Sequence, residues 1–154
     1  MAPRYNPSCK GGIALDRRRR TEILIKGDER LSQKLADEIR SKYEIREIES
    51  PNQGLAMIKM RETSKKELFY LGEVLVTEAK VFVEGTLGMG IVVGDKDELA
   101  FNLAIVDAAY NKGLADVNMW KDILLEEEVR IKDKEKKETA KILETKVDFS
   151  TMNI

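Results

Sequence analysis

The spacing of apolar residues changes twice along this chain, and this change limits the folds open to it more than any other feature. Leu31, Leu35 and Ile39 recur at every fourth position, which is the spacing of one face of an amphipathic helix. Over residues 43–93 the apolar residues alternate with others instead, as they do in strands. The helical spacing then returns. Helices, consecutive strands and further helices predict an α+β fold with a small, mostly antiparallel sheet.

The first third of the chain predicts two helices. The amphipathic stretch covers residues 29–42, and Asp28 before it is a typical N-cap residue. The run Ile23–Ile25 indicates a preceding helix, for which Asp16 is the candidate cap. Two helices joined by a turn also occur in DNA-binding proteins, but the mixed charges of the second helix do not suit a phosphate groove.

The middle of the chain predicts about four strands joined by short turns. They cover residues 43–48, 56–60, 68–83 and 87–93. Pro51 belongs to a turn between the first two strands, and Gly85 belongs to a tight turn between the last two. Gly72 interrupts the long third strand and is typical of a β-bulge.

The last third predicts helices. Acidic residues open the first of them, Asp95–Lys112, and Gly113 is a typical residue to close it. Asp116 is the candidate cap of the next helix. Charged and apolar residues alternate over Glu126–Lys132, which predicts a break, and a highly charged helix resumes over residues 133–146.

One domain is the default for 154 residues, and folding a chain of this size removes roughly 70% of its unfolded surface from water. Residues 1–15 contain prolines and glycines, which predict a flexible N-terminal arm. Residues 16–146 form the α+β domain, and residues 147–154 form a C-terminal tail.

The chain has no histidine and a single cysteine, Cys9, and this excludes several kinds of site. There is no Ser/His/Asp triad, no Cys/His nucleophile pair, no imidazole metal ligand and no intrachain disulfide. Glu73 and Glu78 lie five positions apart in a strand and therefore face opposite sides unless a bulge intervenes. We expect no catalytic residue, no metal site and no cofactor in this chain.

The 27 basic and 28 acidic residues nearly cancel, which argues against a globally basic binder of nucleic acid. No run approaches the length of a membrane span, and the first ten residues have no apolar core of a signal peptide. We therefore expect a cytoplasmic protein that does not contact a membrane.

Two segments are candidates for contact with phosphate or nucleotide: Arg17, Arg18, Arg19 and Arg20, and the hairpin residues Gly85, Thr86 and Gly88. Arginine matches phosphate oxygens well, but a solvated helix start explains the same run of arginines. The hairpin has the glycines of a phosphate loop, but no Gly-Lys-Ser/Thr and no helix follow it directly. Glycines that supply the backbone angles of a turn are the alternative interpretation.

Apolar residues that the chain's own core does not evidently require are typical of surfaces that dock a partner. The helix over residues 96–112 is apolar on two sides, and the tail places apolar residues at the end of the chain. The candidate docking residues are Leu99, Leu103 and Val106 on the helix, and Val147, Asp148, Phe149, Thr151 and Met152 in the tail. Contacts between copies of this chain remain open.

Four motifs follow one another in a specific order. They are a strand with Gly72, Glu73 and Thr77, the hairpin Gly85-Thr86-Leu87-Gly88, the step from Gly94 into a helix with Asp107-Ala108, and the tail Val147-Asp148-Phe149-Ser150-Thr151-Met152. Together they resemble the PhnG subunit of the bacterial carbon–phosphorus lyase core complex. The resemblance extends from the arginine run to Met152.

This resemblance implies a role in phosphonate catabolism within a complex. The reaction associated with the family displaces adenine from ATP with an alkylphosphonate and gives ribose 1-alkylphosphonate 5-triphosphate. A nucleosidase-like, PhnI-type subunit would carry the chemistry, with PhnH-type and PhnJ-type subunits as further partners. ATP and alkylphosphonate would be substrates of the complex, and this chain would be a required subunit without catalytic residues.

The chain departs from the family pattern at the step into the Asp107 helix. It reads Gly94-Asp95-Lys96 where Gly-Arg-Asp is common, and Leu99 stands where a histidine is expected. Any role of that arginine or histidine is therefore not transferred. Ser150 also replaces a common aromatic residue.

Two functions of other classes remain open from the residues alone. One is a free-standing protein that binds RNA or a small anion through Arg17–Arg20, for which salt-dependent binding by the isolated chain is the distinguishing observation. The other is a carboxylate-based hydrolase, which requires activity of the purified single chain.

Overall fold

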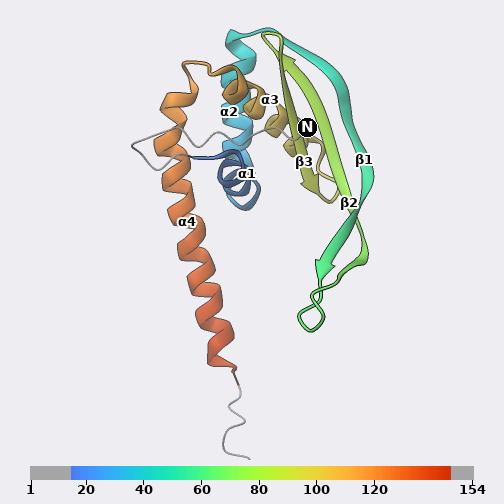
Figure 1. Cartoon of the computed structure of the whole chain (residues 1–154). Coiled ribbons are helices and arrows are strands. Elements are labelled where there is room, and N and C mark those ends of the chain that lie inside the picture. Colours follow the sequence, from blue (N-terminus) through green and yellow to red (C-terminus); the bar gives the residue numbers. More distant parts are fainter. Residues whose placement is uncertain (1–14, 147–154) are drawn as a thin grey trace, which may run out of the picture.

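The computed structural model describes residues 15–146, and Figure 1 shows helices packed on one face of a curved sheet. The elements in chain order are α1 (Arg17–Lys26), α2 (Glu29–Lys42), β1 (Ile45–Arg61), β2 (Leu68–Val83), β3 (Thr86–Val93), α3 (Asp97–Lys112) and α4 (Val117–Glu144). The strands form one antiparallel sheet in the order β1-β2-β3. The predicted α+β fold is confirmed.

The predicted helix signals act as expected at three ends. The Asp16 carboxylate accepts a hydrogen bond from the backbone N–H of Arg19 at 2.8 Å, and the Asp28 carboxylate accepts one from that of Arg30 at 2.9 Å. Gly113 ends α3 with a left-handed φ of 74°, a conformation that glycine adopts without strain.

Asp116 precedes α4 as predicted, but its side chain does not cap the helix. Its carboxylate accepts hydrogen bonds from the Tyr43 hydroxyl at 2.8 Å and from the Lys42 ammonium. These two partners lower the pKa of Asp116, with Lys42 having the larger effect. The residue therefore fastens the start of α4 to the end of α2.

The predicted break at Glu126–Lys132 is wrong, because α4 continues through it as one helix of 28 residues. The charged residues there have partners that alternation along the sequence does not reveal. The Glu128 carboxylate binds Arg19 of α1, and about two turns further on Glu135 binds Lys26. Contacts with α1 thus hold the helix where its own apolar spacing is irregular.

The sheet has three strands and not about four, because residues 45–61 form one strand across Pro51. The pairing of β1 with β2 shifts register between Glu47 and Glu49 and again between Glu49 and Asn52. Pro51 has no N–H to donate, but β1 lies at the edge of the sheet, where proline is tolerated at such irregularities. The predicted turn is therefore an irregular stretch within one strand.

The bulge predicted in the third strand is confirmed beside Gly72. Ile58 of β1 pairs with Gly72, whereas the next residue, Lys59, pairs with Tyr70. Leu71 is thus the additional residue of β2, as in a β-bulge.

The core lies between the sheet and α3, which is buried over most of its length. The inward side chains of the C-terminal half of β2 are Thr77, Ala79, Val81 and Val83, and each of them is fully buried. On β3 the inward positions include Gly88 and Gly90, which lie directly against the backbone of α3. A Cβ atom at Gly90 would stand 1.9 Å from the Ala100 carbonyl oxygen, so only glycine permits this approach.

We expect the substitution Gly88→Ala to lower the free energy of unfolding by about 3 kcal/mol, at the upper end of the cost of overpacking a core. The added Cβ would lie 2.1 Å from the Ala104 carbonyl oxygen and 2.4 Å from the Ala108 nitrogen, and backbone atoms cannot move aside cheaply. Urea unfolding measures the difference. Gly72→Ala is the matched control, since nothing lies within 4 Å of its Cβ position. Equal losses for the two variants would contradict this account.

Candidate functional site

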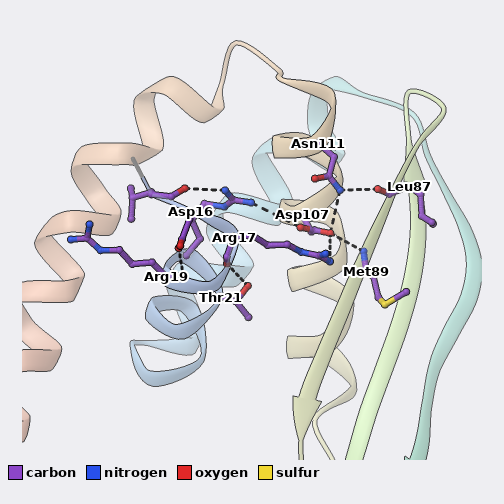
Figure 2. A network of polar contacts seen from close by, with 10 residues as sticks. Asp16, Arg17, Arg19, Thr21, Leu87, Met89, Asp107 and Asn111 are labelled. Carbon is purple, nitrogen blue, oxygen red and sulfur yellow. Dashed lines mark hydrogen bonds and ion pairs between the residues drawn. The ribbon is translucent and has the colours of Figure 1, made fainter. Parts of the chain in front are cut away.

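The arginine run at the start of α1 lies beside Asp107 of α3, and Figure 2 shows this network. The Asp107 carboxylate accepts hydrogen bonds from the Arg17 guanidinium at 2.8 Å and from the backbone N–H of Met89 at 3.2 Å. Asn111 donates a third at 3.3 Å, and the Arg20 guanidinium lies 4.0 Å away. Asp107 therefore joins α1, α3 and β3 through one mostly buried carboxylate.

Arg20 is the most deeply placed of the four arginines, with 12% of its side chain exposed. Its guanidinium carbon lies 3.8 Å from the centre of the Tyr110 ring, a cation–π contact, and the guanidinium donates to the Leu15 carbonyl at 3.0 Å. Burial lowers the pKa of Arg20, but arginine keeps its charge in proteins. This side chain is a structural link between α1 and α3.

Arg19 points to the other side of α1, toward α4. It donates two hydrogen bonds, at 2.8 and 2.6 Å, to the two oxygens of the Glu128 carboxylate. This bidentate contact is the main reason why the pKa of Glu128 is lowered to about 2, and Lys132 adds to it. Arg18, by contrast, has no hydrogen-bond or ion-pair partner among residues 15–146.

A pocket of about 140 Å³ opens between α1, α3 and β3. Its lining includes Arg17, Arg20, Thr21, Gly90 and Asp107. Sites for cofactors and drug-sized ligands are usually about 300–1,000 Å³, so this pocket is too small for a nucleoside triphosphate. The Asp107 carboxylate would also repel a phosphate within it. Within this chain the pocket is therefore no complete nucleotide site.

A family model described as phosphonate metabolism protein PhnG matches residues 15–153. The chain belongs to the PhnG family. The suspected resemblance is thus confirmed over nearly the whole chain, and with it a role in phosphonate metabolism. A search of curated proteins gave no match.

The PhnG-type motif residues Thr77 and Gly94 meet in space. The buried Thr77 hydroxyl donates to the Gly94 carbonyl at 2.7 Å and accepts from the backbone N–H of Lys96 at 3.2 Å. Gly94 has a φ of 91°, which favours glycine at the turn from β3 toward α3. These two residues fix the start of the helix that carries Asp107. Gly72 and Glu73, in contrast, are exposed on the far part of β2.

The prediction that one face of α3 docks a partner is corrected by the structure. Leu99, Leu103 and Val106 are only 3–5% exposed, because α3 is covered by the sheet on one side and by helices on others. Their apolar character therefore has its reason within the chain. The tail residues Val147, Asp148, Phe149, Thr151 and Met152 lie outside the described residues, and their docking role stays a prediction.

The hairpin candidates have structural roles as well. Glu84 and Gly85, with positive φ angles of 49° and 74°, form the two-residue turn between β2 and β3. Gly88 is buried under α3, so the prediction that it contacts phosphate is corrected. Phosphate contact by Gly85 and Thr86 stays a prediction, although the carboxylates of Glu44 and Glu84 line the same depression as Gly85.

Sequence reasoning did not connect Asp107, Tyr110 and Glu128 with the arginines. A signal was available for Asp107, because it is the one charged residue between Glu98 and Lys112 of α3. A buried carboxylate needs a cationic or hydrogen-bonding partner, and the arginine run is the richest source of both. Within residues 15–146 there is no cluster of three or more metal-binding side chains, and no helix is long and apolar enough to cross a membrane.

We expect Glu128→Gln to destabilise the protein at neutral pH and to lose this effect in acid. The folded-state pKa of Glu128, about 2, lies below its ordinary value of 4.5. The stabilisation is therefore complete above about pH 4.5 and disappears as the pH falls toward 2. Thermal unfolding of both proteins across this range measures it. Glu138→Gln on the same helix is the control, because Glu138 has no ion-pair partner among residues 15–146. A difference for Glu128→Gln that does not change with pH would contradict the expectation.

Proposed function

We propose that this chain is the PhnG-type subunit that assists a nucleosidase-like, PhnI-type subunit in making ribose 1-alkylphosphonate 5-triphosphate and adenine from ATP and an alkylphosphonate. The family match over residues 15–153 is the observation that carries this proposal. We further propose that PhnH-type and PhnJ-type subunits belong to the same complex and that it acts in the cytoplasm.

The polar residues described in this chain support a helper role better than a catalytic one. In the reaction a phosphonate oxygen bonds to the ribose C1′ while the bond from C1′ to adenine N9 breaks. Such a displacement needs a group that protonates or stabilises the leaving adenine. The carboxylates with shifted pKa values in this chain, such as Glu128 and Asp116, are held by arginine, lysine or tyrosine and their pKa values are lowered. They are poor proton donors at neutral pH.

A part in holding the anionic substrates is open to two of the four arginines. ATP and alkylphosphonate are both anions, so bringing them together needs cations. Arg19 and Arg20 are committed to Glu128, Asp107 and Tyr110 within this chain. Arg17 pairs with Asp107 but remains 60% exposed, and Arg18 is exposed. We propose that Arg17 and Arg18 contribute to a phosphate site that the partner subunit completes.

The same contacts weigh against a free-standing binder of RNA or a small anion. Such a binder would use the arginine run as a positive patch. Asp107 and Glu128 neutralise much of that charge at short distance. The structure therefore offers no specific observation in favour of this alternative.

Co-expression with a nucleosidase-like subunit tests the proposed function. We expect the two chains to co-purify and to release adenine from ATP only when an alkylphosphonate is present, whereas neither chain alone does so. Adenine is quantified by chromatography, and reactions without the alkylphosphonate are the control. Adenine release by the partner alone would overturn the helper role.

We also expect deletion of residues 147–154 to leave the fold intact and to abolish co-purification with the nucleosidase-like subunit. Full assembly of the truncated chain would show that the tail is not the docking segment.

We expect the double substitution Arg17→Ala and Arg18→Ala to raise the KM of the assembled complex for ATP at least tenfold, while leaving assembly unchanged. Loss of two charge-assisted contacts to phosphate accounts for an effect of this size. Steady-state kinetics of adenine release measures it. Lys134→Ala with Lys137→Ala is a matched control, since it removes two exposed cations from α4. An unchanged KM would exclude these arginines from the substrate site.

A further inference from the structure

The far half of the β1–β2 hairpin extends beyond the rest of the sheet (Figure 1). Strand β3 ends at Val93, opposite Val76 of β2, and the last hydrogen bond from that side goes from the Gly94 N–H to the Leu75 carbonyl at 2.9 Å. Beyond this point β1 and β2 pair only with each other within the described chain. We call the segments Leu55–Arg61 and Leu68–Leu75 the outer ribbon.

The outer ribbon carries exposed apolar side chains on both of its faces, and on one face Lys59, Arg61 and Glu73 lie among them. The strand register places Leu55, Met57 and Tyr70 on the face that continues the core side of the sheet. These side chains are 67%, 60% and 61% exposed. The register places Met60 and Phe69 opposite each other on the other face, where they are 46% and 45% exposed. No helix among residues 15–146 covers either group.

This arrangement is unfavourable for a chain that works alone in water. Scattered exposed apolar residues are ordinary, but contiguous patches mark interaction sites. A two-stranded ribbon is also only marginally stable by itself. In addition, the edge of β2 over Leu68–Val74 has the backbone N–H and C=O groups of an unpaired strand, beside the place that β3 would occupy if it were longer. Both the side chains and the backbone of the ribbon therefore lack a cover.

We propose that the outer ribbon inserts into a slot of the partner subunit, which covers both faces, is apolar except for groups that pair with Lys59, Arg61 and Glu73, and adds a strand beside Leu68–Val74. This proposal rests on the proposed function and names the docking element that it requires. Addition of a strand to a free sheet edge is a common mode of protein recognition, in which backbone hydrogen bonds give affinity and alternate side chains give specificity. The partner is thus a protein with an extended segment next to two apolar layers.

The two apolar faces distinguish this occupant from the other candidates. A membrane surface or a flat protein face covers one side of a ribbon and leaves the other in water. Two copies of this chain that pair their ribbons edge to edge leave both faces exposed, and two that stack their ribbons cover one face of each. A slot satisfies both faces at once.

The tip of the hairpin shows where the slot ends. Residues 62–67 connect the two strands, and all of them are exposed. Four of the six are charged, namely Glu62, Lys65, Lys66 and Glu67. Burying charges without partners costs several kcal/mol each, so the tip has to stay in water, whereas Lys59, Arg61 and Glu73 within the ribbon need charged or polar partners in the slot. The ribbon, about 20 Å long at the usual rise per residue, therefore crosses the partner and emerges on its far side.

The test uses two variants of the full chain in the co-expressed complex. In the first, Asn-Gly replaces residues 57–73 and joins Ala56 to Val74, which already face each other in the register. Asn-Gly is the preferred sequence for such a two-residue hairpin turn. In the second, Met57→Ser and Tyr70→Ser make the ribbon polar without shortening it. Met119→Ser with Ile142→Ser is the matched control, because these side chains on α4 are 68% and 69% exposed.

We expect both ribbon variants to keep the thermal unfolding midpoint of the unmodified chain within a few degrees, since the ribbon has no part in the core. We expect the variant with Met57→Ser and Tyr70→Ser to bind the nucleosidase-like subunit at least tenfold more weakly than the unmodified chain does. The chain with the shortened ribbon is expected not to co-purify with that subunit. The control variant is expected to bind it within twofold of the unmodified chain. Backbone amides of residues 68–74 are expected to exchange with deuterium at least tenfold more slowly in the complex than in the free chain.

The outcomes separate this proposal from the proposed function. Normal assembly of the shortened chain, or unchanged exchange at residues 68–74 in a complex that releases adenine, overturns the ribbon proposal and leaves the proposed function standing. Failure of the unmodified chain to assemble overturns both. A stable dimer of the free chain that is lost with the shortened ribbon would assign the ribbon to a second copy and would also overturn the proposal.

Discussion

The close approach of α3 to the sheet is the contact on which the rest of the structure depends. Gly88 and Gly90 have no side chains, so the helix lies against the backbone of β3. Helix and strand are then near enough for Asp107 to accept a hydrogen bond from the backbone of Met89 and to hold Arg17 at the same time. A larger residue at either glycine would push α3 outward and separate these groups.

The charged residues around α1 act mainly inside the molecule. Asp107 draws α1 toward α3, and Glu128 draws it toward α4, so the arginine run links α1 to both helices. Three of the four arginines have partners within the described chain: Arg17 at Asp107, Arg19 at Glu128, and Arg20 at Tyr110 and Asp107. The charge left for a partner or a substrate is therefore smaller than the run of four suggests, and it lies at Arg18 and at the exposed part of Arg17.

Burial divides the molecule into two parts. The part of the sheet that includes β3 and the C-terminal half of β2, together with α1–α3 and the first half of α4, has a continuous buried core. The outer ribbon and the second half of α4 extend from it with their side chains in water. A folded body with extended parts suits a subunit of a larger assembly, because such parts can make contacts without disturbing the core. This division agrees with the membership in the PhnG family.

The sequence by itself determined the α+β class, the caps at Asp16 and Asp28, the turn at Gly85 and the bulge beside Gly72, because each depends on residues close together in the chain. Its motifs also determined the family. The merging of two strands across Pro51, the continuity of α4 and the burial of the α3 face at Leu103 were decided by tertiary structure.

Each of these depends on what lies opposite a residue in space. A proline is tolerated where the strand is at an edge, and a charged stretch stays helical where α1 supplies partners. An apolar face is a docking surface only if the rest of the chain leaves it uncovered. For the same reason the spacing of apolar residues predicted strands over 56–60 and 68–83, while only the end of β3 at Val93 showed that half of this hairpin has no third strand beside it among residues 15–146.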